Sequence, residues 1–126
     1  MATTSTGGFR ATLGVEDETA EDGRASLTLC ATEAHLNTAG TVQGGVLATL
    51  VDMAMGDAVR STTGEDDVPA TSSLTVTYLR PAVPGRLMVS AQVRKQGENL
   101  TVCDADVEQD GRTLVHALAT FAVLHR

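Results

Sequence analysis

The chain has 126 residues, of which 42% are hydrophobic and 20% charged, a composition typical of a folded globular protein and not of a disordered one. Its formal net charge of −7 argues against nucleic acid or an anionic membrane as the main partner. With two Phe, one Tyr and no Trp, the chain must build its core from Val, Leu, Ala and Met.

The N-terminal third predicts a tail followed by two strands. Residues 1–8 are mostly Thr, Ser and Gly, which predicts a loose tail before a single folded domain over residues 9–126. FRATLGV (9–15) has weak strand character, RASLTLCAT (24–32) has clear strand character, and the acidic EDETAEDG between them predicts a turn. Because the sequence shows neither a signal peptide nor an apolar run near the ~20 residues of a membrane span, we expect a soluble, cytoplasmic protein.

The two cysteines, Cys30 and Cys103, lie in apolar, strand-like segments without the spacing of metal ligands. The three histidines, His35, His116 and His125, do not cluster with them in the sequence. We therefore expect two buried thiols and not a disulfide, which suits a reducing compartment, and we expect no metal site.

A long helix is predicted after the polar, glycine-rich start of HLNTAGTVQGGVLATLVDMAMG (35–56). From this point apolar residues recur at helical spacing on one broad face: Val46, Leu47, Leu50, Val51, Ala54 and Ala58. A narrower stripe holds small or polar residues: Gly45, Ala48, Thr49, Asp52 and Gly56. The polar stretch TTGEDDVPA (62–70) predicts a loop that ends the helix.

Beyond residue 70 the hydrophobic period changes to two, which is typical of strands. Four such segments follow, SLTVTYL, RLMVSAQVRK, NLTVCDADVEQ and TLVHALATFAVLH, separated by the turn-rich RPAVPG, QGEN and QDGR. These short links predict a four-stranded antiparallel meander, with the helix on one face, in an α+β domain. Because the last segment is apolar on both faces, we expect a second copy of the chain to cover one of them.

Asp52 is an acid within an apolar helix, and the pattern leaves three interpretations open: a solvent-facing residue, a buried structural acid or a catalytic carboxylate. Gly44 and Gly45 stand at the predicted helix start, where the free N–H groups of the first turn can polarise a carbonyl oxygen. Asp52 lies ~10 Å further along the helix, too far for both to contact one atom. A site that uses both would therefore lie between two chains.

The motif around this helix resembles that of the hotdog-fold acyl-CoA thioesterases, specifically the PaaI-like branch that includes the 4-hydroxybenzoyl-CoA thioesterases. The family pattern is roughly H-x-N-x-x-G-x-x-[H/Q]-G-G, then an acid in the helix, then a strand that ends in Y-x-x-P-A. The chain matches it at His35, Asn37, Gly40, Gln43, Gly44, Gly45, Asp52, Gly56 and YLRPA (78–82). The resemblance covers about residues 10–124 and implies a hotdog fold, one long central helix wrapped by an antiparallel β-sheet.

The resemblance implies a role for each matching residue. Asp52 would act as nucleophile or as general base toward water, and Thr71 would help to hold that water. Asn37 would orient the water or the thioester, and the backbone N–H of Gly44 would polarise the thioester carbonyl. Asn37 and Gly44 would come from one subunit, and Asp52 and Thr71 from the other. Many members carry His where this chain has Gln43, an amide that can hydrogen-bond to the thioester oxygen but cannot titrate near neutral pH.

The reaction implied is hydrolysis of a small or medium acyl-CoA, aliphatic or aryl, without a cofactor. The acyl group would lie along the small-residue stripe at Gly45, Ala48, Thr49 and Gly56. Candidates for holding the CoA phosphates are Arg80, Arg60 and Arg112. The resemblance also implies a homo-oligomer, a dimer of dimers.

Three alternatives compete with the thioesterase. The chain could bind acyl-CoA without hydrolysing it, or it could be a structural domain with a vestigial site, which Gln43 favours. A hydratase or dehydratase usually pairs a His with an acid, and the helix start offers no obvious His for that role. We expect His35 to make structural hydrogen bonds instead.

Overall fold

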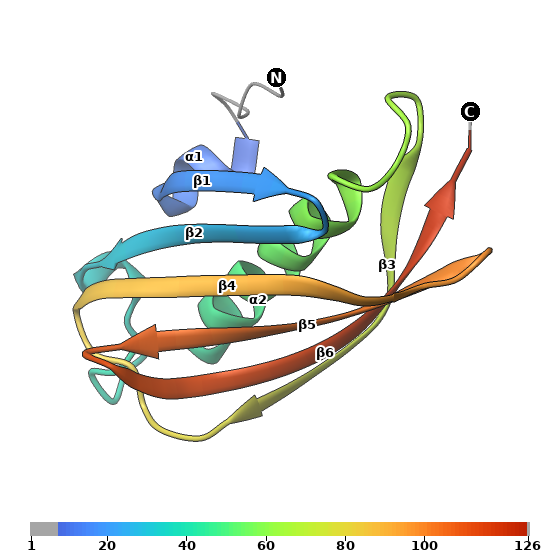
Figure 1. The fold of residues 1–126 in the computed structure, drawn as a ribbon. Coiled ribbons are helices and arrows are strands. Elements are labelled where there is room, and N and C mark those ends of the chain that lie inside the picture. Colours follow the sequence, from blue (N-terminus) through green and yellow to red (C-terminus); the bar gives the residue numbers. More distant parts are fainter. Residues whose placement is uncertain (1–7, 126) are drawn as a thin grey trace.

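The computed structural model describes residues 8–125, in which one long helix lies across one face of a six-stranded antiparallel sheet (Figure 1). The elements in chain order are α1 (Gly8–Leu13), β1 (Val15–Glu21), β2 (Arg24–Ala31), the 3₁₀ turn η1 (Glu33–His35), α2 (Gly44–Arg60), β3 (Val68–Tyr78), β4 (Gly85–Gln96), β5 (Leu100–Gln109) and β6 (Arg112–Leu124). The strands are ordered β1-β2-β4-β5-β6-β3, and each neighbouring pair is antiparallel. The predicted fold, a long helix wrapped by an antiparallel sheet, is confirmed.

Helix α2 buries the apolar face that its periodicity predicted. Its buried side chains are Leu47, Leu50, Val51, Ala54, Met55, Ala58 and Val59. Phe121 of β6 is the largest of the fully buried side chains, and the rest of the core is mainly aliphatic. Each fully buried Val, Leu or Phe contributes about 1.5–3 kcal/mol relative to an exposed one. No helix within residues 8–125 combines the length and apolar character needed to cross a bilayer.

The predicted four-stranded meander is wrong at its first link. β3 pairs with β6 at one edge of the sheet, whereas β4 pairs with β2 and β5. The link 79–84 therefore passes the ends of β5 and β6, three strand spacings or about 14 Å. Six extended residues reach about 20 Å, and Pro81 and Pro84 favour extended backbone that donates no ladder hydrogen bond. Link length alone does not separate this crossover from a hairpin.

Two assignments near the N-terminus are also wrong. Residues Gly8–Leu13 form a short helix and not a strand, and the acidic Val15–Glu21 forms a strand and not a turn. β1 is an edge strand with mostly exposed side chains, so most of its acidic residues stay in water, while Glu18 contacts Arg10. Gly14, at φ 93°, adopts the left-handed conformation that ends α1. Residues 1–7 of the predicted tail lie outside the described residues, and Gly8 belongs to α1.

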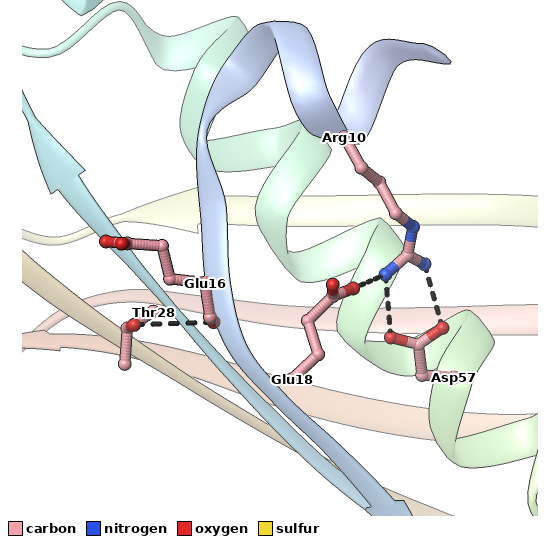
Figure 2. Close-up of polar contacts among 5 residues, drawn as sticks. All are labelled: Arg10, Glu16, Glu18, Thr28 and Asp57. Carbon is pink, nitrogen blue, oxygen red and sulfur yellow. Dashed lines mark hydrogen bonds and ion pairs between the residues drawn. The ribbon is translucent and has the colours of Figure 1, made fainter. Parts of the chain in front are cut away.

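Arg10 ties α1 to the long helix. Its guanidinium donates hydrogen bonds of 3.0 and 2.8 Å to the two carboxylate oxygens of Asp57 in α2, and it also contacts Glu18 of β1 (Figure 2). Burial lowers the pKa of Arg10, but the hydrogen bonds and charges of the two carboxylates outweigh it, so that the pKa is raised overall. These contacts with two carboxylates fix α1 and β1 against the C-terminal end of α2.

The two cysteines lie on opposite sides of the sheet. Cys103 of β5 is fully buried, as predicted, but the prediction of a buried thiol is wrong for Cys30. Cys30 is exposed because it faces away from α2, while its neighbours Leu29 and Ala31 face the core. β4 lies between the two strands, so the thiols do not form a disulfide. Burial, with a smaller effect from the charge of Asp104, raises the pKa of the Cys103 thiol to about 11.

These environments predict that one thiol per native chain reacts with iodoacetamide at pH 8. Cys30 is open to solvent, whereas Cys103 is buried and stays protonated until about pH 11. Intact-mass spectrometry should show one adduct on the native chain and two after denaturation. A Cys30→Ser variant should show none until it unfolds, and rapid native labelling of that variant would contradict the buried position of Cys103.

Candidate functional site

Asp52 and Thr71 lie side by side on α2 and β3. The Thr71 hydroxyl donates a hydrogen bond of 2.7 Å to Oδ1 of Asp52, whose side chain is half-buried. Within residues 8–125, Oδ2 of Asp52 accepts no hydrogen bond. A carboxylate held at one oxygen and free at the other can take a proton from water or attack a carbonyl carbon. The structure places Thr71 beside the acid, and the catalytic roles of both residues stay a prediction.

A β-bulge turns Thr71 towards the helix. Thr71 pairs with Phe121 and Ser73 with Thr120, so Ser72 is an extra residue in β3. The Ser73 hydroxyl lies 2.7 Å from that of Thr120 on the outer face of the sheet, whereas Thr71 faces α2. Without the bulge, strict alternation would put Thr71 on the same outer face as Ser73. β3 begins at Val68, within a stretch that was predicted to be a loop.

The N-terminus of α2 presents two backbone N–H groups. Gln43 is the N-cap residue, and its exposed side chain makes no capping hydrogen bond. No oxygen within the described part of the chain accepts a hydrogen bond from the N–H of Gly44 or Gly45. These groups carry the positive end of the helix dipole and can bind a polarised carbonyl oxygen.

Tyr78 holds the helix start from the end of β3. Its hydroxyl donates a hydrogen bond of 2.7 Å to the carbonyl oxygen of Gly44. A Cβ on Gly44 would lie 3.3 Å from that hydroxyl, whereas a Cβ on Gly45 would meet nothing within 4 Å. Tyr78 was part of the predicted motif but had no predicted role. In the sequence, Tyr78 stands out only as the single tyrosine of the chain at the end of a predicted strand, which does not predict its contact with the helix start.

The loop before α2 is organised by Asn37. The Asn37 Oδ1 accepts hydrogen bonds from the N–H groups of Ala39 and Thr41, and Nδ2 donates one of 2.9 Å to the Thr41 hydroxyl. Nδ2 has a second hydrogen that could reach a ligand. His35 makes structural contacts, as predicted: Nε2 donates to the carbonyl of Leu13, and Nδ1 accepts a backbone N–H.

Two halves of the predicted site lie apart in one chain. Asp52 is seven residues beyond Gly45 on the same helix, a rise of about 10 Å. Asn37 belongs to the loop at the helix start, where the Gln43 N–H donates to the carbonyl of His35. One chain therefore brings together Asp52 with Thr71, and separately places Asn37 near the helix N-terminus.

The remaining predicted residues fall in two regions. The first region is helix α2, where Gly45, Ala48, Thr49 and Gly56 occupy exposed or part-exposed positions. The Thr49 hydroxyl donates to the carbonyl of Gly45, and a Cβ on Gly56 would lie 3.6 Å from the ring of Phe121. Arg80 lies on the link between β3 and β4 and shares a surface hollow with Arg112, whereas Arg60 ends α2, about 24 Å from its start.

Residues 8–125 contain no cluster of three or more His, Cys, Asp or Glu side chains that could hold a metal ion. The groups of the described residues that can act on a carbonyl compound are the Asp52 carboxylate, the Thr71 hydroxyl and the backbone N–H groups at the start of α2.

Comparison with known proteins gives concordant matches in sequence and structure. The model of the thioesterase superfamily matches residues 39–116, more than half of the chain. Human acyl-coenzyme A thioesterase 13 is 38% identical over 77 residues, which cover 60% of this chain and 54% of that protein. The chain thus spans about half the length of that relative.

Two solved structures show the same fold. A thioesterase family protein from Silicibacter pomeroyi superposes with a TM-score of 0.87 at 31% identity, covering 93% of this chain and 89% of that one. A Bacillus halodurans protein solved with CoA superposes with a TM-score of 0.76 at 30% identity, covering 79% and 66% of the respective chains.

Proposed function

Because this chain belongs to the thioesterase superfamily, a family of thioester hydrolases, we propose that it hydrolyses an acyl-CoA to the free acid and CoA. The observation that carries the proposal is the 2.7 Å hydrogen bond from Thr71 to Asp52, which leaves one carboxylate oxygen free. The CoA-bound relative supports CoA as the carrier. We propose a small or medium acyl group, aliphatic or aryl, as in the PaaI-like branch.

We propose that a second copy of the chain completes the site. β3 is an edge strand, so its outer edge is open to pair with the same strand of another copy. Tyr78 contacts the start of α2, and Thr71 contacts its middle at Asp52. An antiparallel β3–β3 pair centred between positions 71 and 78 would put the helix start of each copy level with Asp52 of the other.

In the proposed reaction, the thioester oxygen accepts hydrogen bonds from the Gly44 N–H and the Gln43 amide of one copy. In the first route, Asp52 of the other copy deprotonates a water that Thr71 and Asn37 orient, the hydroxide adds to the carbonyl carbon, the C–S bond breaks, and the CoA sulfur takes the proton. In the second route, Asp52 itself adds to the carbonyl carbon and expels the CoA thiolate, and water then hydrolyses the acyl-Asp anhydride to release the acid and restore Asp52. General-base help of this kind is worth about 10²- to 10⁴-fold, and one oxyanion donor about 10²- to 10³-fold.

The acyl group is proposed to lie along the part-exposed stripe of α2 at Ala48, Thr49, Gly45 and Gly56. This makes Gly45→Ala informative, because a Cβ there meets nothing within 4 Å and adds only a methyl group to the stripe. We expect an unchanged melting temperature and about a tenfold higher KM for the best acyl-CoA, the usual effect of one methyl group in a tight pocket. Steady-state kinetics and thermal unfolding of both proteins would test this, and an unchanged KM for every acyl-CoA would remove Gly45 from the acyl site.

The proposed activity is tested by chromatographic measurement of free CoA from short aliphatic, long aliphatic and aryl acyl-CoAs. Turnover of at least one thioester supports the hydrolase, and the profile of rates assigns the acyl class. Tight acyl-CoA binding without CoA release would support the alternative, a non-catalytic acyl-CoA-binding protein. Gln43, where many relatives carry His, would then be the first residue to replace.

We propose a homotetramer, a dimer of β3-paired dimers, in the reducing cytoplasm. Support for further assembly comes from the outer face of the sheet, where the side chains of Met88 and Leu118 are half exposed. Two thiols that do not pair suit a reducing compartment. Light scattering of the purified chain distinguishes a tetramer from a dimer of 13.1 kDa subunits.

A further inference from the structure

Tyr78, at the end of β3, contacts the first residue of α2 with both its ring and its hydroxyl. A Cβ on Gly44 would lie 3.4 Å from Cζ of the ring and 3.5 Å from Cε1, so the ring lies directly against the backbone of that residue. The hydroxyl donates its 2.7 Å hydrogen bond to the Gly44 carbonyl oxygen. Because the Tyr78 side chain is half exposed, water could satisfy this hydroxyl, and burial does not force it onto the carbonyl.

The backbone after β3 fixes the tyrosine beside the helix start. The N–H groups of Leu79 and Arg80 both donate to the carbonyl oxygen of Leu114, at 2.8 and 3.2 Å. These bonds hold the end of β3 against β6, the strand with which it pairs. The Tyr78 hydroxyl is therefore delivered to Gly44 by a rigid part of the sheet.

The hydrogen bond from Tyr78 is not needed to attach the helix start or to satisfy its carbonyl. The Val42 N–H, two residues before the helix, already donates to the carbonyl of Ala82 at 2.8 Å. In the α-helical pattern, the Gly44 carbonyl already accepts the N–H of Ala48. A second donor on that carbonyl oxygen thus has an effect other than filling an unpaired group.

The peptide that accepts the hydrogen bond from Tyr78 also carries the N–H of Gly45. The Gly44 carbonyl and that N–H belong to one amide, whose resonance passes electron density between oxygen and nitrogen. A donor at the oxygen draws density from the nitrogen and strengthens the N–H as a donor, by about 10–30% per hydrogen bond. Within residues 8–125 no oxygen accepts the Gly45 N–H, so the strengthened donor is left for a ligand.

A carbonyl oxygen at the helix start can reach both of the first N–H groups. The N–H groups of the first turn point out of the helix end, and those of Gly44 and Gly45 are consecutive. Gly45 is exposed, and a Cβ there would meet nothing within 4 Å, so the described part of the chain does not block its approach.

We propose that Tyr78 is a positioning residue for the hydrolysis: its hydroxyl polarises the Gly44–Gly45 peptide, and the Gly45 N–H becomes the second donor to the thioester oxygen. The proposal rests on the proposed function, because that oxygen is the acceptor. The oxygen carries more negative charge in the transition state than in the bound substrate, so the stronger donor raises kcat and leaves KM nearly unchanged. A gain of about 10–30% on a donor worth about 10²- to 10³-fold corresponds to about a two- to eightfold higher kcat.

Tyr78→Phe keeps the ring against Gly44 and removes only the hydroxyl. We expect kcat for the best acyl-CoA to fall about two- to eightfold, with KM and the melting temperature near those of the wild type. Ser73→Ala is the matched control, because it also removes a 2.7 Å hydroxyl hydrogen bond from β3, on the outer face of the sheet. It should leave both kinetic constants unchanged. Equal falls in kcat in the two variants, or none in Tyr78→Phe, overturn the proposal.

A change in donor strength distinguishes polarisation from simple support of the helix. Because the chain has one tyrosine, expression with ring-fluorinated tyrosine alters Tyr78 alone. Fluorine makes the phenol more acidic and its hydroxyl a stronger donor, so kcat should exceed that of the wild type at a pH where both phenols are protonated. The amide chemical shift of Gly45 reports the polarisation without substrate, and it should move in opposite directions in Tyr78→Phe and in the fluorinated protein.

The two readouts separate this proposal from the proposed function. A Gly45 signal and a kcat that both follow the donor strength of the hydroxyl support it. A Gly45 signal that ignores the hydroxyl, or equal kcat with tyrosine and fluorinated tyrosine, contradicts it even where the chain hydrolyses thioesters. A chain that hydrolyses no thioester, with a Gly45 signal that follows the hydroxyl, contradicts the proposed function and leaves the polarised N–H assigned.

Discussion

Replacing Asp52 by Asn is expected to lower kcat for acyl-CoA hydrolysis by about 10²- to 10⁴-fold, the range that a general base contributes. The amide has almost the same size, and its oxygen can still accept the hydrogen bond that Thr71 donates. It can neither take a proton from water nor attack a carbonyl carbon. Chromatography of the released CoA under saturating substrate measures the loss, and thermal unfolding should show a melting temperature near that of the wild type.

Asp57→Asn is the matched control for this prediction. It makes the same chemical change five residues further along α2, but Asp57 is bound to Arg10 and not to the proposed site. We expect it to lower stability by about 1–3 kcal/mol, because Arg10 loses the charge of one of its two carboxylate partners and keeps only that of Glu18, and to keep kcat within a few-fold. Similar losses of kcat in the two variants would argue that the loss at position 52 reflects structure and not chemistry.

Replacing Gly44 by Pro is expected to lower kcat by about 10²- to 10³-fold, because it removes the N–H proposed to bind the thioester oxygen. The first helical position tolerates proline well, and Gln43 already has the extended backbone (φ −56°, ψ 133°) that a following proline requires. Gly44→Ala keeps the N–H and adds only the Cβ that approaches Tyr78. Side-by-side kinetics should leave alanine within about tenfold of the wild type, and equal losses in the two variants would refute the oxyanion role.

The same two variants test whether the site lies between chains. A dimer of one Asp52→Asn chain and one Gly44→Pro chain has one site with both changes and one with neither. Random reassociation after mild denaturation makes about half of the dimers mixed, so about a quarter of the sites should be intact. Recovery of activity in the mixture, with each variant inactive alone, would locate the site at the subunit interface. If verified mixed dimers recover no activity, the site lies within one chain.

The long helix and the strands β4 to β6 could be predicted from the sequence, because each has a sustained period and its apolar face is buried. The short helix Gly8–Leu13 could not, since six residues do not distinguish a period of 3.6 from one of 2. The acidic strand β1 was missed because an edge strand with solvated side chains lacks the apolar alternation of a core strand. The place of β3 depends on a crossover that link length does not reveal.

The site was predictable in part for similar reasons. Asp52 stood out because a carboxylate in a small-residue stripe breaks the pattern of a buried helix. Thr71 was found through the family motif, since alternation along β3 would have turned it away from the acid. The pairing of Arg80 with Arg112 has no local signal at all, because tertiary structure brings them together across 32 residues.

The bulge at Ser72 has a consequence for how this protein can change during evolution. Thr71 meets Asp52 because Ser72 is left out of the ladder with β6. If Ser72 entered the ladder, it would pair with Phe121 and face the helix in place of Thr71, which would turn to the outer face of the sheet. A shift of the bulge by one residue is thus expected to remove the hydroxyl of Thr71 from the acid, whereas deletion of Ser72 would make the strand regular and leave Thr71 opposite Phe121. An alignment of relatives should therefore show the hydroxyl residue either before a bulge or, where the bulge is absent, directly before the residue equivalent to Ser73.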